Sequence, residues 1–215
     1  MDKLKDLLHS VRDEYSKDKF DISTADDNPF NQFEKWFSLA VAANIPDVNA
    51  MNLATADKNG RPSSRIVLLR DANEDGFTFF TNYNSRKGSQ LLENAFAALN
   101  FFWPQLEKQI RVEGKVSKVS DQVSDEYFAS RPVDSQIGAW ASDQSHTIQS
   151  REELEEKFKT LKQKYSDAVP RPPHWGGFLL QPDYFEFWQG RPSRLHDRVV
   201  YHPEGNTWHK SMIAP

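Results

Sequence analysis

The amino-acid sequence predicts a mainly β protein with added helices, an α+β fold whose sheet is strongly curved or closed into a barrel. From Ala50 onward, short segments of alternating apolar and polar residues are separated by turn signals, which is typical of strands. These segments follow one another closely and few helices come between them. Such an order favours antiparallel pairing over a parallel sheet.

Before the first strand, the pattern predicts two helices joined by a linker. Residues 2–17 place apolar side chains at helical spacing and predict a short amphipathic helix that carries Arg12. The polar, acidic segment 20–29 is typical of a linker. Asn28 and the proline after it form an N-cap signal for a helix to about residue 43. Its expected core-facing stripe is Phe30, Phe33, Trp36, Phe37, Ala40 and Val41.

Strands are predicted over residues 51–56 and 63–71, and Asn59 with Gly60 favours a tight hairpin between them. The further strands expected in this part of the chain are 77–81, 95–103 and 108–119.

Three more helices are predicted. A brief one covers 85–94, and Ser120 is the expected N-cap of another that carries Tyr127. Ser150 and Glu153 form a capping-box pattern for a helix to about residue 165. The side chains of this last helix expected to face the core are Leu154, Phe158 and Leu161. A proline-rich loop, 170–173, then leads to the last strands.

Length and composition limit the class of protein. The 215 residues suit one domain, 1–215, with a helix and linker in 1–28 and the last strands in 175–215. A net charge of −4 argues against a nucleic-acid binder, and the lack of cysteine excludes disulfides and thiolate catalysis. No metal motif is present, so no metal site is expected. The charged N-terminus and the lack of a long apolar run predict a cytoplasmic protein without a membrane partner.

The most informative stretch is 185–198, which reads FEFWQGRPSRLHDR. If residues 194–201 are extended, Arg194, His196 and Arg198 share one face of a strand. On the preceding strand Glu186 and Trp188 share a face, while the phenylalanines on either side of Glu186 point to the core. The predicted hairpin therefore offers cations, an aromatic ring and a titratable base together.

Other cations are candidates for binding a phosphate dianion, which is best held by several Arg or Lys donors from separate segments. Arg65 and Arg70 flank the segment IVLL, and Arg131 lies in the segment YFASRPVDSQ. Arg86 and Lys87 lie at the start of a predicted helix, where free backbone N–H groups also attract anions.

The stretch Glu186 to Arg198 resembles the C-terminal signature of the pyridoxine (pyridoxamine) 5′-phosphate oxidase family: Glu, aromatic, Trp, Gln, four variable residues, then Arg-Leu-His-Asp-Arg. The RIVLL and SRKG segments extend the resemblance across nearly the whole chain. It implies a split β-barrel homodimer with FMN at the subunit interface. The resemblance further implies that FMN is bound by Arg65, Ile66, Val67, Leu68, Leu69, Phe80, Thr81, Arg86, Lys87, Gln109, Gln144, Ser145, Trp188 and Arg198.

The same resemblance implies a separate substrate site. Its residues would be Arg12, Tyr15, Arg70, Tyr127, Arg131, Ser135, Arg194, Leu195 and His196. Arg194 and His196 would be catalytic, through ring contact and orientation of substrate groups, with base action by His196 left open. Arg12 and Tyr15 match N-terminal positions that cover the site, so residues 1–28 are expected to include a lid. Position 70 departs from the family in having Arg instead of Lys, and the C-terminus lacks the family's Arg-Leu-x-Pro ending.

The implied reaction is oxidation of pyridoxamine 5′-phosphate or pyridoxine 5′-phosphate to pyridoxal 5′-phosphate. Hydride would pass from the substrate C4′ to flavin N5, and O2 would be reduced to hydrogen peroxide. One alternative is a flavin reductase or other split-barrel protein with another substrate. A second alternative, from a different class, is a non-catalytic carrier of FMN or pyridoxal phosphate.

Overall fold

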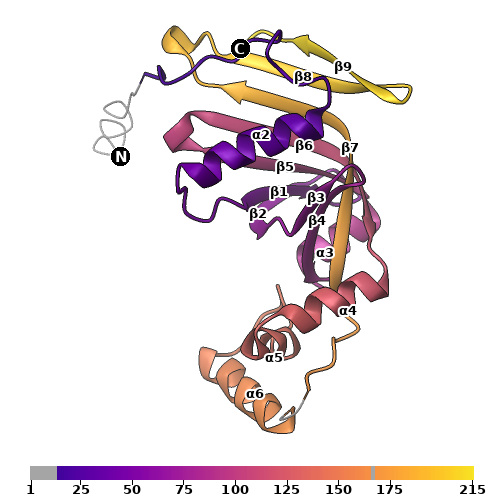
Figure 1. Ribbon diagram of the computed structural model, residues 1–215. Coiled ribbons are helices and arrows are strands. Elements are labelled where there is room, and N and C mark those ends of the chain that lie inside the picture. The colour runs from indigo at the N-terminus through magenta and orange to yellow at the C-terminus, as the bar shows by residue number, and fades with distance from the viewer. Residues whose placement is uncertain (1–13, 166–167) are drawn as a thin grey trace. The chain divides into compact units, whose positions relative to one another are not determined.

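The computed structural model describes residues 14–165 and 168–215 (Figure 1). The strands of this part are β1 (Ala50–Ala56), β2 (Pro62–Leu68), β3 (Asp71–Asn73), β4 (Gly76–Asn82), β5 (Phe96–Trp103), β6 (Lys108–Lys118), β7 (Trp175–Gln189), β8 (Asp197–Glu204) and β9 (Thr207–Met212). The helices are α2 (Pro29–Ala42), α3 (Arg86–Glu93), α4 (Asp121–Ser130), α5 (Val133–Ala141) and α6 (Arg151–Lys164), with short 3-10 turns η1 (Pro104–Leu106) and η2 (Pro192–Arg194). A mainly β protein with added helices is therefore confirmed.

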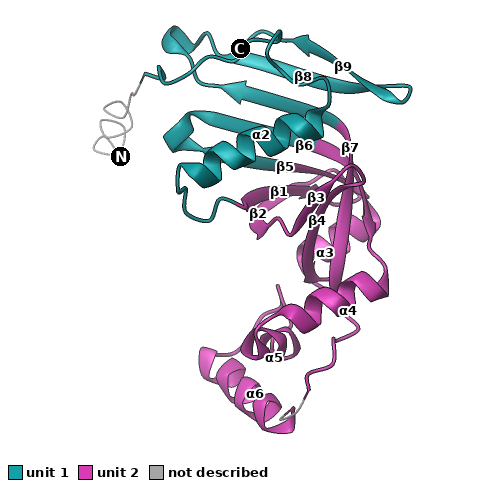
Figure 2. Cartoon of the chain, in the orientation of Figure 1, with its two compact units in different colours: residues 1–48, 100–112, 184–215 teal, residues 49–99, 113–183 magenta. Residues whose placement is uncertain are grey.

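The strands form one sheet in the order β2-β1-β5-β6-β7-β4-β3, with β8 paired to β7 and β9 paired to β8. The hairpins β1–β2, β3–β4, β7–β8 and β8–β9 and the pair β4–β7 are antiparallel. The chain divides into two compact units, residues 1–48, 100–112 and 184–215 and residues 49–99 and 113–183 (Figure 2). Strands β5, β6 and β7 run from one unit into the other. The predicted single domain stays a prediction.

The first unit has an aromatic core beneath α2. The side chain of Asn28 accepts a hydrogen bond from the Phe30 N–H, which confirms the predicted N-cap. Trp36 is buried and meets Phe187 at 5.3 Å between ring centroids. Val41, expected in the core-facing stripe, is instead 51% exposed, because it lies about 100° around the helix from the fully buried Ala40 and so at the edge of the stripe.

The N-terminal segment differs from the prediction. Most of the expected helix 2–17, including Arg12, lies outside the described residues, and residues 14–17 are not helical. The expected linker is anchored: Phe20 is buried, and its ring lies 4.8 Å from that of Trp36. A single aromatic side chain in a polar segment can be buried when neighbouring elements supply aromatic rings for it to pack against.

The second unit contains the β1–β2 hairpin, whose register pairs Leu53 with Arg65. Its turn contains Gly60 at φ 79°, the left-handed conformation that the Asn-Gly signal predicts. Ser120 and Ser150 cap α4 and α6 as expected, and Ser85, predicted as the first residue of its helix, caps α3; each accepts a backbone N–H three residues on.

Helix α5 was not predicted, although Ile137 and Ala141 lie one turn apart and are both buried. It lies beside α6 (Figure 1). Leu154, Phe158 and Leu161 of α6 are only half-buried. Among the described residues no helix is both long and apolar enough to cross a lipid bilayer.

The last hairpin begins later than predicted. Gln189 pairs with Asp197, so residues 190–196 form a loop and β8 starts at Asp197. Pro192 has no N–H to give to a ladder, and Ser193 and Arg194 have φ of 58° and 61°. The expectation that Arg194 and His196 lie on a strand beside Arg198 was therefore wrong.

Candidate functional site

One arginine of β2 and one lysine of α3 lie close together in the second unit. Arg65 donates to the Leu53 carbonyl at 3.1 Å and to the hydroxyls of Thr55 and Ser63, both at 2.6 Å. Lys87 is 8% exposed. Its ammonium donates to Thr81 Oγ1 at 3.2 Å and to the Gln144 side-chain oxygen at 2.9 Å.

These cations lack acidic partners. No ion pair of the described residues involves Arg65, Arg86 or Lys87. Burial and then the charge of Arg65 lower the pKa of Lys87 to about 8. Burial and then the charge of Arg86 lower the pKa of Arg65. A buried cation without a counter-charge is costly, so this cluster suits an anionic ligand.

A second cationic group lies over stacked aromatic rings. The rings of Phe80 and Tyr127 stack at 3.9 Å, and Trp175 stacks on Phe80 at 5.5 Å. The Arg131 guanidinium lies 4.6 Å from the Trp175 ring and that of Arg70 lies 5.7 Å from the Tyr127 ring. Such cation–π contacts are favourable but leave guanidinium N–H groups free to bind a ligand.

Arg131 shows this directly, because its Nη1 is buried and has no hydrogen-bond partner. Burial is also the main cause that lowers the pKa of Arg131, with the charge of Arg70 acting in the same direction and Tyr127 against it. Arg171 holds the aromatic group in place by donating to the Trp175 carbonyl at 2.7 Å and pairing with Asp121 and Asp125.

Lys87 of the first group and both arginines of the second line one pocket of about 480 Å³. The predicted site residues that line it are Ile66, Val67, Leu68, Arg70, Phe80, Thr81, Lys87, Tyr127, Arg131, Ser135 and Gln144. The lining residues that sequence reasoning missed are Asn82, Gly138, Ala139, Ser142 and Trp175. Three of these missed residues belong to α5 or its C-cap, and the spacing of Ile137 and Ala141 was the signal that could have located them.

Four predicted flavin-site residues of this unit are not among those that line the pocket. Arg65 is half-buried and donates to the hydroxyls of Thr55 and Ser63, and Arg86 is exposed at the start of α3. The backbone N–H of Leu69 donates to the Asn49 carbonyl at 2.8 Å, and Ser145 is exposed at φ 73°. Their assignment stays a prediction.

The first unit contains a separate group of three rings. Trp188 and His196 lie 4.6 Å apart, and Tyr15 meets them edge-on at 5.5 and 5.8 Å. Arg194 and Leu195 are exposed in the loop before β8. Gln109 is half-buried on β6 and is outside this ring cluster. Tyr15 thus lies beside Trp188 and His196, from which it is distant in sequence, and the assignment of these residues to substrate or cofactor stays a prediction.

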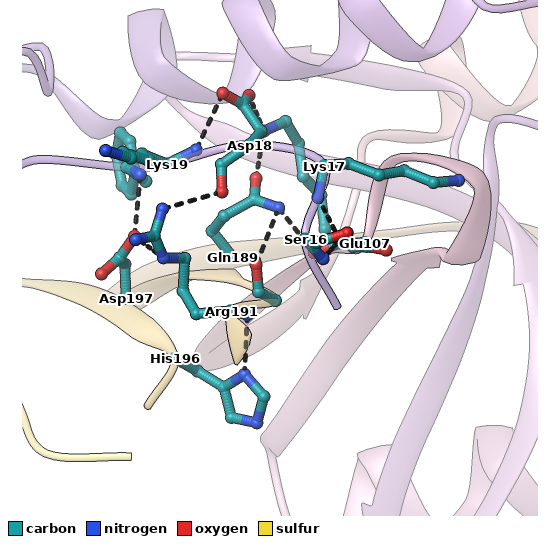
Figure 3. Close-up of polar contacts among 12 residues, drawn as sticks. Ser16, Lys17, Asp18, Lys19, Glu107, Gln189, Arg191, His196 and Asp197 are labelled. Atoms are coloured by element: carbon teal, nitrogen blue, oxygen red, sulfur yellow. Dashed lines mark hydrogen bonds and ion pairs between the residues drawn. The ribbon is translucent and has the colours of Figure 1, made fainter. Parts of the chain in front are cut away.

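The protonation state of His196 follows from its contacts. Its Nδ1 lies 3.1 Å from the Arg191 backbone N–H and accepts a hydrogen bond from it (Figure 3). Burial, and then the charges of Arg194 and Arg198, lower the pKa of His196 below 6.5. The neutral imidazole therefore carries its proton on Nε2 at neutral pH, which makes Nε2 a hydrogen-bond donor.

Arg198 makes a bidentate pair with the buried Glu186, at 2.8 and 2.9 Å. Arg111 and Tyr184 also contact Glu186 Oε2, at 2.9 and 3.1 Å. Burial alone would raise the pKa of Glu186, but the hydrogen bond from Arg198 and the two guanidinium charges hold this pKa below 4.5. This network fixes the guanidinium of Arg198 on the face of the hairpin that also carries Trp188.

We expect Glu186→Gln to lower the free energy of unfolding by about 2–3 kcal/mol at neutral pH, because it removes the carboxylate that pairs with the partly buried guanidinium of Arg198. A carboxyl with a lowered pKa stabilises above its ordinary value of 4.5 and loses this effect as the pH falls through the folded value. The free energies of unfolding of wild type and variant, measured with urea, should therefore become equal as the pH falls into the acid range. Glu204→Gln, at a side chain that is 73% exposed, is the control and should change little. Parallel acid profiles for wild type and Glu186→Gln would contradict the assignment.

Comparison with known proteins agrees with this fold. The family model for pyridoxamine 5′-phosphate oxidase matches residues 37–165, and that for the pyridoxine 5′-phosphate oxidase C-terminal dimerisation region matches 175–215. The pyridoxine/pyridoxamine 5′-phosphate oxidase of Paraburkholderia phymatum is 54% identical, over 97% of this chain and 99% of its own. The protein of the same name from Cytophaga hutchinsonii is 52% identical, over 99% of this chain and 100% of its own.

Solved structures show the same fold. PhzG from Burkholderia lata 383, in complex with tetrahydrophenazine-1-carboxylic acid, has a TM-score of 0.87 and 30% identity, covering 93% of this chain and 100% of its own. A pyridoxamine 5′-phosphate oxidase-related, FMN-binding protein from Nostoc punctiforme has a TM-score of 0.68 at 18% identity, covering 87% of this chain and 98% of its own. The fold and the relatives together define an oxidoreductase of the split-barrel class. The chain belongs to the pyridoxine/pyridoxamine 5′-phosphate oxidase family.

Proposed function

We propose that the chain oxidises pyridoxamine 5′-phosphate and pyridoxine 5′-phosphate to pyridoxal 5′-phosphate, with FMN as cofactor and O2 as the final oxidant. The observation that carries this proposal is a pocket lined by two sets of cations, Lys87 and the pair Arg70 and Arg131. Two phosphorylated molecules need two such groups. The names of relatives that are more than half identical support the choice of substrate.

The residues of the cluster around Lys87 fit the phosphate of FMN. A dianion would supply the counter-charge that Arg65, Arg86 and Lys87 lack, and Arg65 is already oriented by the hydroxyls of Thr55 and Ser63. Bound FMN supplies a hydride acceptor that O2 can reoxidise. Trp188 and Arg198 remain proposed flavin contacts, as does Gln109.

Arg131 and Arg70 would hold the substrate phosphate, with Tyr127 and Ser135 beside them. The free Nη1 of Arg131 supplies a donor for it. His196 would donate from Nε2 to a substrate oxygen or nitrogen and orient the ring, since its Nδ1 is already engaged. This argues for an orienting role of His196 and against action as a base. Positioning of this kind can contribute roughly 7–11 kcal/mol to lowering a barrier.

The matched dimerisation region, residues 175–215, supports a homodimer. We propose that the second copy contributes to each site, as the resemblance implies. Sedimentation of the purified protein tests this point, and a monomer at micromolar concentration would contradict it.

The deciding experiment measures oxygen uptake by FMN-loaded protein with pyridoxamine 5′-phosphate, and hydrogen peroxide as product. Uptake with formation of pyridoxal 5′-phosphate is expected. A flavin-loaded protein without uptake would leave the reductase or carrier alternatives. Protein that stays colourless after addition of FMN would exclude every flavin-based function.

His196→Leu is expected to lower kcat/KM by roughly 10- to 100-fold while bound flavin is retained, because one oriented donor to the substrate is lost. Arg194→Leu should act in the same direction. Steady-state kinetics measure the loss of kcat/KM, and the visible absorption spectrum of the purified variant measures the bound flavin. His209→Leu, an exposed substitution on β9, serves as the control. Loss of flavin from either variant would place these residues in the cofactor site.

A further inference from the structure

Glu107 joins three segments of the first unit. It follows the turn η1 and is buried, with φ 53°. Its Oε2 accepts the backbone N–H groups of Ser16 and Lys17, both at 2.9 Å (Figure 3). Its own carbonyl accepts the N–H of Gly190 at 2.8 Å. The turn between β5 and β6 thus binds both the N-terminal segment and the loop that follows β7.

These contacts place Tyr15 against the candidate site. A Cβ on Gly190 would lie 2.7 Å from Tyr15 Cγ and 3.0 Å from Glu107 Cβ, so both side chains pack directly on the glycine backbone. The ring of Tyr15 then meets those of Trp188 and His196 edge-on. The position of this ring depends on the two backbone N–H groups just after it, which Glu107 binds.

Residues 15–20, here named the strap, are held at their other end as well. The carboxylate of Asp18 pairs with the buried ammonium of Lys108 at 2.9 Å, and the Phe20 N–H donates to Asp197 Oδ2 at 2.9 Å. Burial acts to raise the pKa of Asp18, but the hydrogen bond and charge of Lys108 hold it below its ordinary value. The far end of the strap therefore stays in place when Glu107 is changed.

Arg191 connects the strap to the imidazole. Its guanidinium donates to the Asp18 carbonyl at 3.1 Å and lies 3.5 Å from Asp197, while its backbone N–H donates to His196 Nδ1 (Figure 3). The loop that carries His196 is thereby bound to the strap through both the backbone and the side chain of one residue.

We infer that Glu107 is a positioning residue, which holds Tyr15 against His196 and Trp188 by binding the N–H groups of Ser16 and Lys17 and so shapes the substrate side of the site. This inference rests on the proposed function. Because a carboxylate accepts both N–H groups with one charged oxygen, an amide at this position retains an acceptor of similar reach but without the charge. Glu107→Ala therefore removes both the acceptor and its charge, whereas Glu107→Gln removes the charge alone and should have the smaller effect on the position of Tyr15.

The first measurement is hydrogen exchange of full-length protein. In Glu107→Ala the amides of Ser16 and Lys17 should exchange about tenfold faster or more, because each loses a hydrogen bond to a charged group. The amide of Phe20, bound by Asp197, should keep its protection. Glu107→Gln should lie between wild type and Glu107→Ala, and Glu204→Ala is the matched control at an exposed site. Unchanged exchange at Ser16 and Lys17 in Glu107→Ala would overturn the inference.

The second measurement is steady-state kinetics with pyridoxamine 5′-phosphate. We expect kcat/KM of Glu107→Ala to fall about tenfold, mainly through KM, with flavin content unchanged and partial recovery in Glu107→Gln. Tyr15→Ala should reproduce the rise in KM. This variant tests whether the half-buried Tyr15 ring matters for the substrate, while Glu107→Gln still tests the contacts to Ser16 and Lys17 if Glu107→Ala does not fold.

The outcomes separate this inference from the proposed function. Wild-type protein without turnover would reject the proposed oxidase, while the exchange data would still report whether Glu107 holds the strap. Active wild-type protein whose KM is the same in Glu107→Ala, despite faster exchange, would reject the positioning role alone.

Discussion

Lys87→Met is expected to weaken FMN binding by about 100-fold or more while making the flavin-free protein more stable. Truncating one partner of a buried charge pair costs roughly 2–5 kcal/mol of binding free energy, and Lys87 would be such a partner for the cofactor phosphate. Without the phosphate the same ammonium is an uncompensated buried cation, which explains why its pKa falls to about 8. One substitution should therefore change affinity and stability in opposite senses.

The effect of Lys87 on stability can be followed through the pH dependence of the free energy of unfolding of the flavin-free protein. The unfolded chain keeps this proton up to about 10.5, whereas the folded flavin-free protein releases it near 8. Since the unfolded state binds more protons between these values, the free energy of unfolding should rise with pH in this window, by up to about 3 kcal/mol. In Lys87→Met this rise should be absent.

Flavin fluorescence titration and urea unfolding across that pH range test both effects. Lys115→Met, an exposed position on β6, is the control and should leave affinity and pH profile unchanged. If Lys87→Met binds FMN as tightly as wild type, Lys87 is not a phosphate ligand. A flavin-free variant that is less stable than wild type at neutral pH would mean that the ammonium is compensated by a group other than those described.

Arg131→Met is expected to lower kcat/KM for pyridoxamine 5′-phosphate by about 100-fold or more without loss of bound FMN. The buried Nη1 of Arg131 has no partner, so its charge is available to a ligand in the pocket and is lost in the variant. The backbone contacts of this residue, its N–H to the Phe128 carbonyl and its carbonyl to the Gln136 amide, remain in place after substitution. The effect should therefore be on the substrate and not on the fold.

A graded series sharpens this test. Arg131→Lys keeps a point charge but loses the planar fork, so its kcat/KM should fall between those of wild type and Arg131→Met. Arg151→Met removes an exposed arginine on α6, whose side chain is 83% exposed, and should be silent. Loss of flavin in Arg131→Met, or full activity, would show that the two cationic groups have been assigned to the wrong molecules.

Much of the local structure could be predicted because it depends on neighbours in sequence. Asn28 and Ser120 cap their helices through hydrogen bonds that span two or three residues, and Gly60 adopts the left-handed conformation that its turn requires. Alternation also predicted that the side chains of Phe185 and Phe187 point into the core, where both are fully buried.

The errors arose where a distant segment decided the outcome. Residues 20–29 look like a polar linker, yet Phe20 is buried because α2 and β7 provide aromatic partners. Arg194 and His196 have the alternation of a strand, but the pairing of Gln189 with Asp197 leaves both in a loop. Local pattern carries no information about the register of a hairpin whose loop is long.

For the site, the sequence by itself determined which residues carry the charge and hydrogen-bonding groups: Lys87, Arg131 and His196 were identified by residue type, motif and family resemblance. Only the tertiary structure decided the protonation and hydrogen-bonding state of each of these residues. Burial among uncharged partners lowers the pKa of Lys87, an unpaired Nη1 makes Arg131 available, and the N–H of Arg191 sets the tautomer of His196. These properties depend on desolvation and on contacts between segments distant in sequence, which only the folded chain brings together.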